Sequence, residues 1–372
     1  MKYWRGYLVA AIALACALGL RQFAETHTVL VDMIYPYVTR MVQDFLADWS
    51  AAVPFNVWQV ALLALGVLVL ASIVLMIIFK WNPIQWFGWI TAVAALFVLL
   101  HTGIYGLNNF AGPLSDDIRL KDADTKYSFS ELERAAVYYR DEANKLAAKV
   151  NRDSNGDPRY PAFQTLAQQA GTGFEALTFD DHTPVFAGST VPVKELGWSD
   201  FFTSKGIASF SVPITGEFAV NPQIPGFYQP FVMCHEMAHR MCIAIDADAD
   251  MAAFLACKAN PSVEFQYAAY LKAYRNCYAA IQSVASNSTT EILQRLQAGE
   301  TAMLKRDLET YRAFFGQYAD SMENSGFTDL LVVWHIQEII LPQQIVEEEK
   351  VFDPKDPNDV DLSGIVNALP RD

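Results

Sequence analysis

Three stretches near the N-terminus are apolar over about the length of a helix that crosses a bilayer. They lie near residues 4–20, 57–79 and 87–107, and His101 is the one side chain in the last two that could carry a charge. A helix needs about 20 predominantly apolar residues to cross the hydrocarbon core. The pattern therefore predicts an α-helical membrane anchor of three spans.

Basic residues beside these spans predict how the chain crosses the membrane. Lys2 and Arg5 accompany the first span, and Lys80 lies in the short loop between the second and the third. Short loops on the cytoplasmic side of a membrane carry an excess of basic residues. We therefore expect a multi-pass protein of the cell membrane with everything after residue 107 outside the cytoplasm. A cleaved signal peptide is the alternative for the first span, but we favour a retained anchor.

The segment between the first two spans is patterned differently. Residues 29–35 and 42–46 mix apolar and polar positions as amphipathic helices do. Such segments lie along a membrane surface or cover a soluble domain. We expect residues 21–56 to do one of these.

Residues 108–372 have the composition of a globular domain, and their patterns are mainly helical. Ser130 and Glu133 form a capping box for a helix that runs to residue 150. A second helix, 161–177, is expected to be interrupted at Gly171 and Gly173. Residues 207–221 alternate as a strand does, and Pro213 and Gly216 indicate an edge strand or a hairpin. Further helices are predicted at 262–281, 290–296, 303–318 and 329–340.

The candidate chemistry lies in the motif His235-Glu236-Met237-Ala238-His239. On a helix, residues four apart lie on one face, so both imidazoles can bind one metal ion. Glu236 lies one step around the helix, where it can take a proton from a metal-bound water. A short motif also arises by chance, and one histidine is usually a core residue. Two histidines with this spacing on an apolar helix are better explained by a metal, because buried ionisable groups are costly unless paired or ligated.

A catalytic zinc site usually has three protein ligands. Asp246, Asp248 and Asp250 follow the motif, and Glu264 lies farther along. A straight helix would place Asp248 about 13 Å beyond His239, so the chain must turn between them. Asp246 can cap a second helix beginning near residue 247. The alternative is that the three aspartates only complement that helix N-terminus.

Charge and cysteine content exclude some functions. The net charge of -14 disfavours binding to nucleic acid. Four cysteines outside the first span could form two disulfides, and without a Cys-x-x-Cys pair we expect structural roles for them rather than metal binding. These are Cys234, Cys242, Cys257 and Cys277.

Several short segments together resemble an uncharacterised bacterial family, catalogued as a domain of unknown function. The segments are residues 206–221, Pro230-Phe231, 235–239, Ile243-Ala244 and 253–257, within about 191–274. Members of that family join about three N-terminal spans to a zincin-like domain. The resemblance implies an HExxH zinc metallopeptidase with a mainly α, zincin-like α+β domain and a small sheet or hairpin.

The resemblance also implies a third ligand. In the family the motif is followed by Glu-Asp-Glu-Ala-Asn, whose second Glu resembles the third ligand of other zincins. Asp248 stands at that position here, and Asp250 replaces the Asn. The expected site is therefore Zn²⁺ on His235, His239 and Asp248, with Glu236 as the base that activates water against a peptide or protein substrate. Because Asp is one methylene shorter than Glu, a catalytically inactive zinc-binding pseudopeptidase acting as membrane sensor or scaffold is the alternative, and an accidental motif is the third hypothesis.

Overall fold

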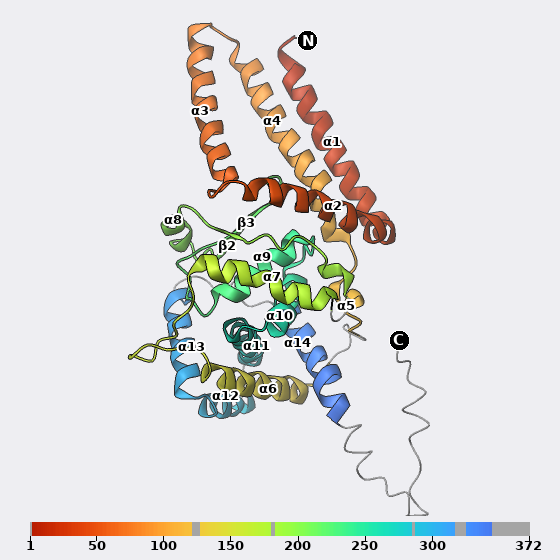
Figure 1. Ribbon diagram of the computed structural model, residues 1–372. Helices are drawn as coiled ribbons and strands as arrows, with labels where there is room; N and C mark the ends of the chain where they lie inside the picture. Colours follow the sequence, from red (N-terminus) through yellow and green to blue (C-terminus); the bar gives the residue numbers. More distant parts are fainter. Residues whose placement is uncertain (1, 121–126, 180–182, 285–286, 317–324, 344–372) are drawn as a thin grey trace, which may run out of the picture.

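The computed structural model describes residues 2–120, 127–179, 183–284, 287–316 and 325–343 (Figure 1). The chain is mostly helical, and the described part contains a small three-stranded sheet. Three long helices project from one side of a body built from the other elements (Figure 1). This confirms the predicted balance of helix and sheet.

The projecting helices are α1 (Arg5–Thr26), α3 (Val57–Ile78) and α4 (Pro83–Ile104). Each is long and apolar enough to cross a membrane, which confirms the three predicted apolar helices. The third begins earlier than expected because the Asn82 side chain accepts a hydrogen bond from the Gln85 amide and Pro83 opens the helix.

Small residues let α1 and α4 pack closely. A Cβ added to Gly6 would lie 2.3 Å from the carbonyl carbon of Gly88, so the two backbones touch there. Alanines continue the seam on both helices. Such small residues are what allow apolar helices to associate when lipid and side chains are equally apolar. The seam consists of Gly6, Ala10 and Ala13 against Gly88, Ala92 and Ala95.

The two amphipathic segments belong to one helix, α2 (Thr28–Ala51), which lies across the lower ends of α1, α3 and α4 (Figure 1). One face of α2 is buried against the body, through Val31, Thr39, Arg40, Gln43, Ala47 and Ser50. Of the two alternatives, the contact with the domain is the one that these buried residues show.

The sheet has the strand order β1-β3-β2. Strand β1 (Lys194–Glu195) runs parallel to β3 (Glu217–Val220), and β2 (Ser209–Val212) pairs antiparallel with β3, with Phe210 opposite Ala219. The turn between β2 and β3 contains Gly216 at φ 64°, a left-handed conformation that favours glycine. The predicted hairpin is confirmed, and β2 is an edge strand.

A buried carboxylate joins this sheet to the second span. Glu217 accepts hydrogen bonds from the Val57 and Trp58 amides at 2.7 and 2.8 Å, where α3 begins. Lys194 donates to the same carboxylate at 2.7 Å. A negative charge at a helix N-terminus satisfies amides that have no partner inside the helix. The sheet and α3 are thus held together.

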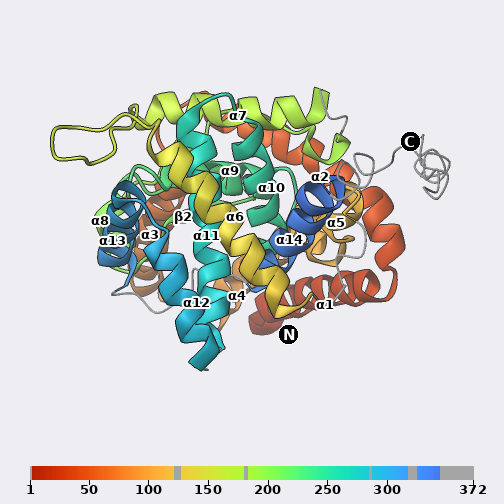
Figure 2. The same cartoon turned by 90° about the horizontal axis from the view of Figure 1, so that it is seen from below.

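Helices α9 and α10 lie at the centre of the body. From below, α6 crosses α11, with α9 and α10 beside them and α7 along one edge (Figure 2). The helices of the body are α5 (Leu114–Asp117), α6 (Phe129–Ala147), α7 (Phe163–Phe179), α8 (Ser199–Thr203), α9 (Gln229–Arg240), α10 (Asp246–Ala259), α11 (Val263–Ser283), α12 (Asn287–Ala298), α13 (Ala302–Phe315) and α14 (Ser325–His335). Short helical turns are η1 (Lys2–Trp4), η2 (Gly106–Phe110), η3 (Pro184–Phe186) and η4 (Ile336–Ile340).

Two local predictions were wrong. The capping box of α6 is Ser128 with Glu131, not Ser130 with Glu133, so the helix starts earlier and still buries its apolar face. Helix α7 runs unbroken through its glycines. A Cβ at Gly173 would lie 2.0 Å from the carbonyl oxygen of Ala256, so this glycine serves the contact with α10.

The cysteines are not paired. All five, Cys16, Cys234, Cys242, Cys257 and Cys277, are free thiols. The two disulfides that the sequence permitted are therefore not formed, and the four cysteines of the body are buried.

Candidate metal centre

Helix α9 carries the HExxH motif and ends in a turn that brings the chain back on itself. The Cys242 amide donates to the His239 carbonyl at 2.9 Å, and the Ile243 amide donates to the Ala238 carbonyl at 3.2 Å. Cys242 has φ 70°, so the two bonds and the left-handed residue form a Schellman motif. The turn reverses the chain between α9 and α10, as the spacing of the motif and the aspartates required.

This turn also orients His239. The Nδ1 atom of His239 lies 2.8 Å from the Ile243 carbonyl oxygen. A carbonyl can only accept, so Nδ1 carries the proton and Nε2 keeps its lone pair. His239 is buried, and its Nε2 is held in place with a lone pair available to a metal ion.

A carboxylate orients His235 in the same way. The Nδ1 atom of His235 lies 2.9 Å from Asp250 Oδ1, and Lys272 Nζ lies 3.6 Å from the other oxygen. Burial acts to raise the pKa of Asp250, but Lys272 and His235 outweigh it and the pKa is lowered. The ionised carboxylate accepts from Nδ1, which leaves Nε2 of His235 as the ligand atom. Such carboxylate–histidine pairs are usual behind metal sites.

Asp246, the first residue of α10, completes the cluster. Ligand atoms of His235, His239 and Asp246 all lie within 4.8 Å of one another. Asp246 Oδ1 is 3.3 Å from His239 Nε2, and the two imidazole rings are nearly perpendicular at 86°. Tetrahedral zinc with bonds of about 2.0–2.2 Å holds neighbouring ligand atoms about 3.3–3.5 Å apart. The separation of Asp246 Oδ1 and His239 Nε2 has this value, and the remaining pairs of ligand atoms lie within 4.8 Å.

Glu236 lies beside the cluster and its side chain is buried. The residue is 3% exposed, and Oε2 has no hydrogen-bond partner among the residues that the structure describes. A buried carboxylate oxygen without a partner is costly. This oxygen lies next to the two histidines and can accept a hydrogen bond from water or from a bound group.

The electrostatics of the cluster favour a positive charge. Burial acts to lower the pKa of His239, but Asp246, Glu236 and the Ile243 carbonyl outweigh it and the pKa is raised. The contact with His239 in turn lowers the pKa of Asp246, whose side chain is 78% exposed. A proton or a metal ion can supply this positive charge. Solvent reaches the cluster from the side of Asp246.

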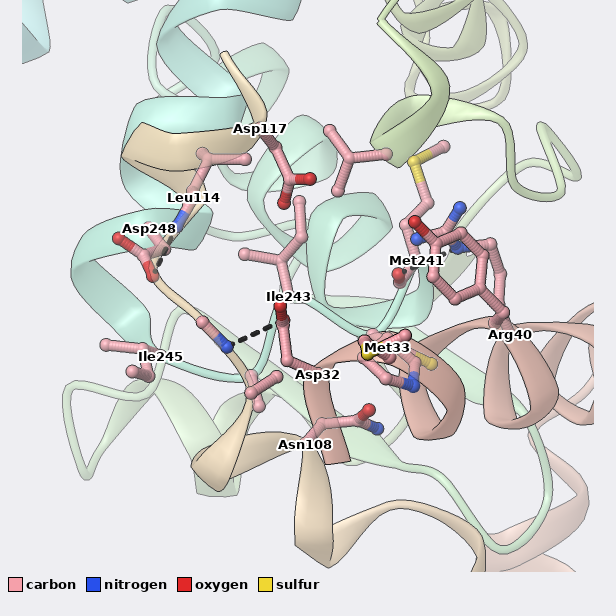
Figure 3. Close-up of a pocket in the computed structure, with 17 residues that line it drawn as sticks. Asp32, Met33, Arg40, Asn108, Leu114, Asp117, Met241, Ile243, Ile245 and Asp248 are labelled. Atoms are coloured by element: carbon pink, nitrogen blue, oxygen red, sulfur yellow. Dashed lines mark hydrogen bonds between the residues drawn. The ribbon is translucent and has the colours of Figure 1, made fainter. Parts of the chain in front are cut away.

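The structure places Asp248 elsewhere. Its Oδ2 accepts from the Leu114 amide at 3.2 Å, and the residue lines a cavity of about 280 Å³ between α2 and the turn after α9 (Figure 3). Burial raises the pKa of Asp248, and the Leu114 amide opposes this. On a helix that begins at Asp246, two residues rotate a side chain by about 200°. Asp246 and Asp250 therefore face α9, and Asp248 does not join the cluster.

The other side chains considered from the sequence have partners of their own. Glu264 accepts from the Ser262 hydroxyl at 2.5 Å, and the Tyr267 hydroxyl donates to Asp307 at 2.5 Å. Tyr270 and His335 both pack on Tyr138, and burial lowers the pKa of His335 to about 4. We assign none of them to the metal centre.

Sequence reasoning missed the groups behind the histidines. Asp250 was considered as a third ligand, whereas it orients His235; the Ile243 carbonyl was not considered. The available signal was the spacing of Asp246 and Asp250. Residues four apart share a helix face, so a helix start at Asp246 would have paired these two and set Asp248 apart.

Comparison with known families identifies the family to which the chain belongs. A family model described as a protein of unknown function (DUF3810) matches residues 31–330. The chain belongs to this family. The matched region includes most of α2, two of the three apolar helices and the whole HExxH cluster. Comparisons with curated proteins and with solved structures give no match. The description of the family states no activity.

Proposed function

We propose that this member of the family is a membrane-anchored zinc-dependent metallopeptidase. The observation that carries the proposal is the unpartnered Oε2 of Glu236 beside two oriented histidines and Asp246. Zinc prefers nitrogen and carboxylate ligands of this kind. The zincin-like character of the domain is part of the same proposal.

Three residues would hold the ion, and a fourth would move protons. His235 and His239 would bind through Nε2 and Asp246 through a carboxylate oxygen, with Asp246 in the role that the family resemblance gave to Asp248. When bound, zinc supplies a Lewis acid that lowers the pKa of water and polarises a carbonyl. Glu236 would accept a proton at Oε2 and return it to the leaving amine.

The membrane anchor would hold this chemistry at the cell membrane. Three helices are long and apolar enough to cross, and Lys2, Arg5 and Lys80 favour a cytoplasmic N-terminus. The catalytic domain would then lie outside the cytoplasm. Its substrates would be peptides or proteins.

The test compares the full-length wild-type protein with Glu236→Gln in detergent. Both are loaded with zinc and incubated with denatured casein, and the products are identified by mass spectrometry. We expect Glu236→Gln to bind zinc normally and to cleave about 10²–10⁴-fold more slowly. Glu264→Gln, a carboxylate paired with Ser262, is the matched control and should keep full activity.

Two outcomes would contradict the proposal. Equal cleavage by wild type and Glu236→Gln would remove Glu236 from the reaction. Stoichiometric zinc without any cleavage by the wild type would favour the pseudopeptidase acting as a sensor or scaffold.

A further inference from the structure

One face of α2 is apolar and uncovered. Large apolar side chains recur along it at spacings of three and four, which places them on a single stripe. Met41 and Phe45 are 73% and 69% exposed. The stripe comprises Leu30, Ile34, Val38, Met41, Phe45 and Trp49.

This face lies where the apolar helices meet the body. Helix α1 ends at Thr26, directly before α2, and α3 begins at Val57, shortly after it. The Tyr35 hydroxyl of α2 donates to the Thr102 carbonyl near the end of α4 at 2.9 Å. Figure 1 shows α2 lying across these three helix ends. The apolar stripe is continuous with the candidate spans, so its occupant is the bilayer interface.

The opposite face of α2 holds the turn that follows the HExxH motif. Arg40 Nε donates to the Met241 carbonyl at 3.2 Å, and Thr39 Oγ1 lies 3.3 Å from Cys242 Sγ. The Tyr105 hydroxyl, at the end of α4, donates to the carbonyl of His239 itself at 3.1 Å. The backbone of one proposed ligand, His239, and the turn that follows it are therefore hydrogen-bonded to α2 and to the end of α4.

A second connection prevents the body from swinging away. Glu217 caps α3 through the Val57 and Trp58 amides, and the Asn56 side chain donates to the Glu195 carbonyl at 2.7 Å. The sheet and the α9–α10 turn are thus fixed to different apolar helices. Two separate attachments hold the metal centre at one height.

That height decides which substrates can reach the metal. An α-helix with its side chains is about 10–12 Å thick, so the cluster lies at least about 10 Å from the interface that α2 occupies. An extended chain covers about 3.3 Å per residue. A polypeptide leaving the bilayer would need at least about 3 residues to reach the cluster, and a site within about ten residues of its own span would fit.

We propose that the substrates are polypeptides anchored in the same membrane, cleaved a short distance from the bilayer. The inference rests on the peptidase function proposed above and names its substrate class. A membrane-anchored substrate is delivered at the height of the metal centre, whereas a freely soluble one gains nothing from this arrangement.

The test uses the full-length protein in vesicles of phosphatidylethanolamine and phosphatidylglycerol with three reporters. The first has a single membrane span, an unstructured linker and a folded tag on the side of the catalytic domain. The second carries a rigid helical spacer of about 30 Å, or about 20 residues, between span and linker. The third lacks the span. Comparing the two anchored reporters removes the trivial gain from confinement to a surface.

We expect the first reporter to be cleaved at least about 10-fold faster than the second, at bonds within about ten residues of the span. Equal rates for the two anchored reporters would overturn the inference and leave the peptidase function standing. Cleavage of none of the three by zinc-loaded protein would overturn both.

A variant of the apolar stripe sharpens the test. Met41→Glu combined with Phe45→Glu should reduce the preference for the first reporter over the second at least about 5-fold. Two added charges weaken the binding of α2 to the membrane interface. Zinc content and cleavage of the soluble reporter should be unchanged. Met303→Glu, at an exposed apolar position on α13, is the control. An unchanged preference in the stripe variant would contradict the role of α2.

Discussion

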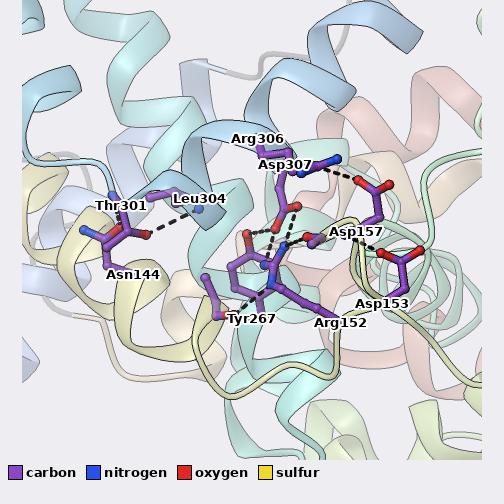
Figure 4. Close-up of polar contacts among 11 residues, drawn as sticks. Asn144, Arg152, Asp153, Asp157, Tyr267, Thr301, Leu304, Arg306 and Asp307 are labelled. Carbon is purple, nitrogen blue, oxygen red and sulfur yellow. Dashed lines mark hydrogen bonds and ion pairs between the residues drawn. The ribbon is translucent and has the colours of Figure 1, made fainter.

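Two groups of charged side chains in this protein differ in whether every member has a partner among the described residues. The first joins Arg152, Tyr267 and Asp307 (Figure 4). Arg152 donates to both oxygens of Asp307 at 3.0 and 2.6 Å, and the Tyr267 hydroxyl donates to one of them at 2.5 Å. Arg152 also donates to the carbonyls of Ala147 and Gly156. Every charge in this group is balanced within the chain.

The HExxH cluster is built in the opposite way. The Nδ1 atoms of its histidines are satisfied by Asp250 and the Ile243 carbonyl. The candidate ligand atoms of His235, His239 and Asp246 instead all lie within 4.8 Å of one another. Glu236 Oε2 has no partner in the described part of the chain. The first group closes on itself, whereas the second leaves atoms open that we propose bind a metal ion and a substrate. Breaking each group should therefore have a different kind of effect.

The largest expected effect is on the closed group. Asp307 is 1% exposed, and Asp307→Ala would leave the partly buried Arg152 without its counter-charge. We expect the free energy of unfolding to fall by about 3–5 kcal/mol, measured by thermal denaturation in detergent. Asp157→Ala removes the exposed partner of Arg306 and should cost about 0–1 kcal/mol. Similar losses in the two variants would contradict the structural role of the closed group.

Metal should stabilise the open cluster only when its ligands are intact. Zinc at about 100 times its dissociation constant should stabilise the wild type by about 2.7 kcal/mol relative to the chelated protein. The same titration on His239→Ala should leave the melting temperature unchanged. A shift of equal size in His239→Ala would locate the stabilising ion elsewhere.

The carboxylate behind His235 should tune affinity without binding the metal. Asp250→Asn keeps an acceptor for Nδ1 but removes the charge, so we expect zinc affinity to fall about 10–100-fold. Competition with a fluorescent zinc chelator measures this change. Asp248→Asn is the matched control, and a comparable loss there would mean that the register of α10 is not the one described.

The smallest expected effect is on stability at Glu236. Because Oε2 has no partner among the described residues, Glu236→Gln breaks no hydrogen bond seen at that atom and should change the free energy of unfolding by less than about 1 kcal/mol. Denaturation of the chelated protein in parallel with the Asp307 variant gives the comparison. A loss of several kcal/mol would show that Glu236 serves the fold, as Asp307 does.

Local patterns in the sequence were sufficient for much of this architecture. The apolar helices, the amphipathic α2, the β2–β3 hairpin and the helix that carries the motif each depend on neighbouring residues. The HExxH spacing alone was enough to predict a shared face for His235 and His239. Helix boundaries were harder to predict from the sequence. Ser128 and Ser130 both fit a capping box, and only the packing of α6 selects Ser128.

The rest depends on contacts between distant residues. The choice between Asp246 and Asp248 required the first residue of α10, which the turn at Cys242 sets. Arg152 and Asp307 are 155 residues apart, so no local pattern could pair them. The contact of Tyr105 with His239 likewise joins the end of an apolar helix to the motif across 134 residues.

Metal content tests the central claim most directly. Zinc is measured by elemental analysis in the purified full-length wild type, His239→Ala, Asp246→Ala and Asp248→Ala. We predict close to one zinc per chain in the wild type and Asp248→Ala, with loss in His239→Ala and Asp246→Ala. Loss in Asp248→Ala with retention in Asp246→Ala would move the third ligand. A wild-type protein that takes up no zinc when supplied with it would contradict the account.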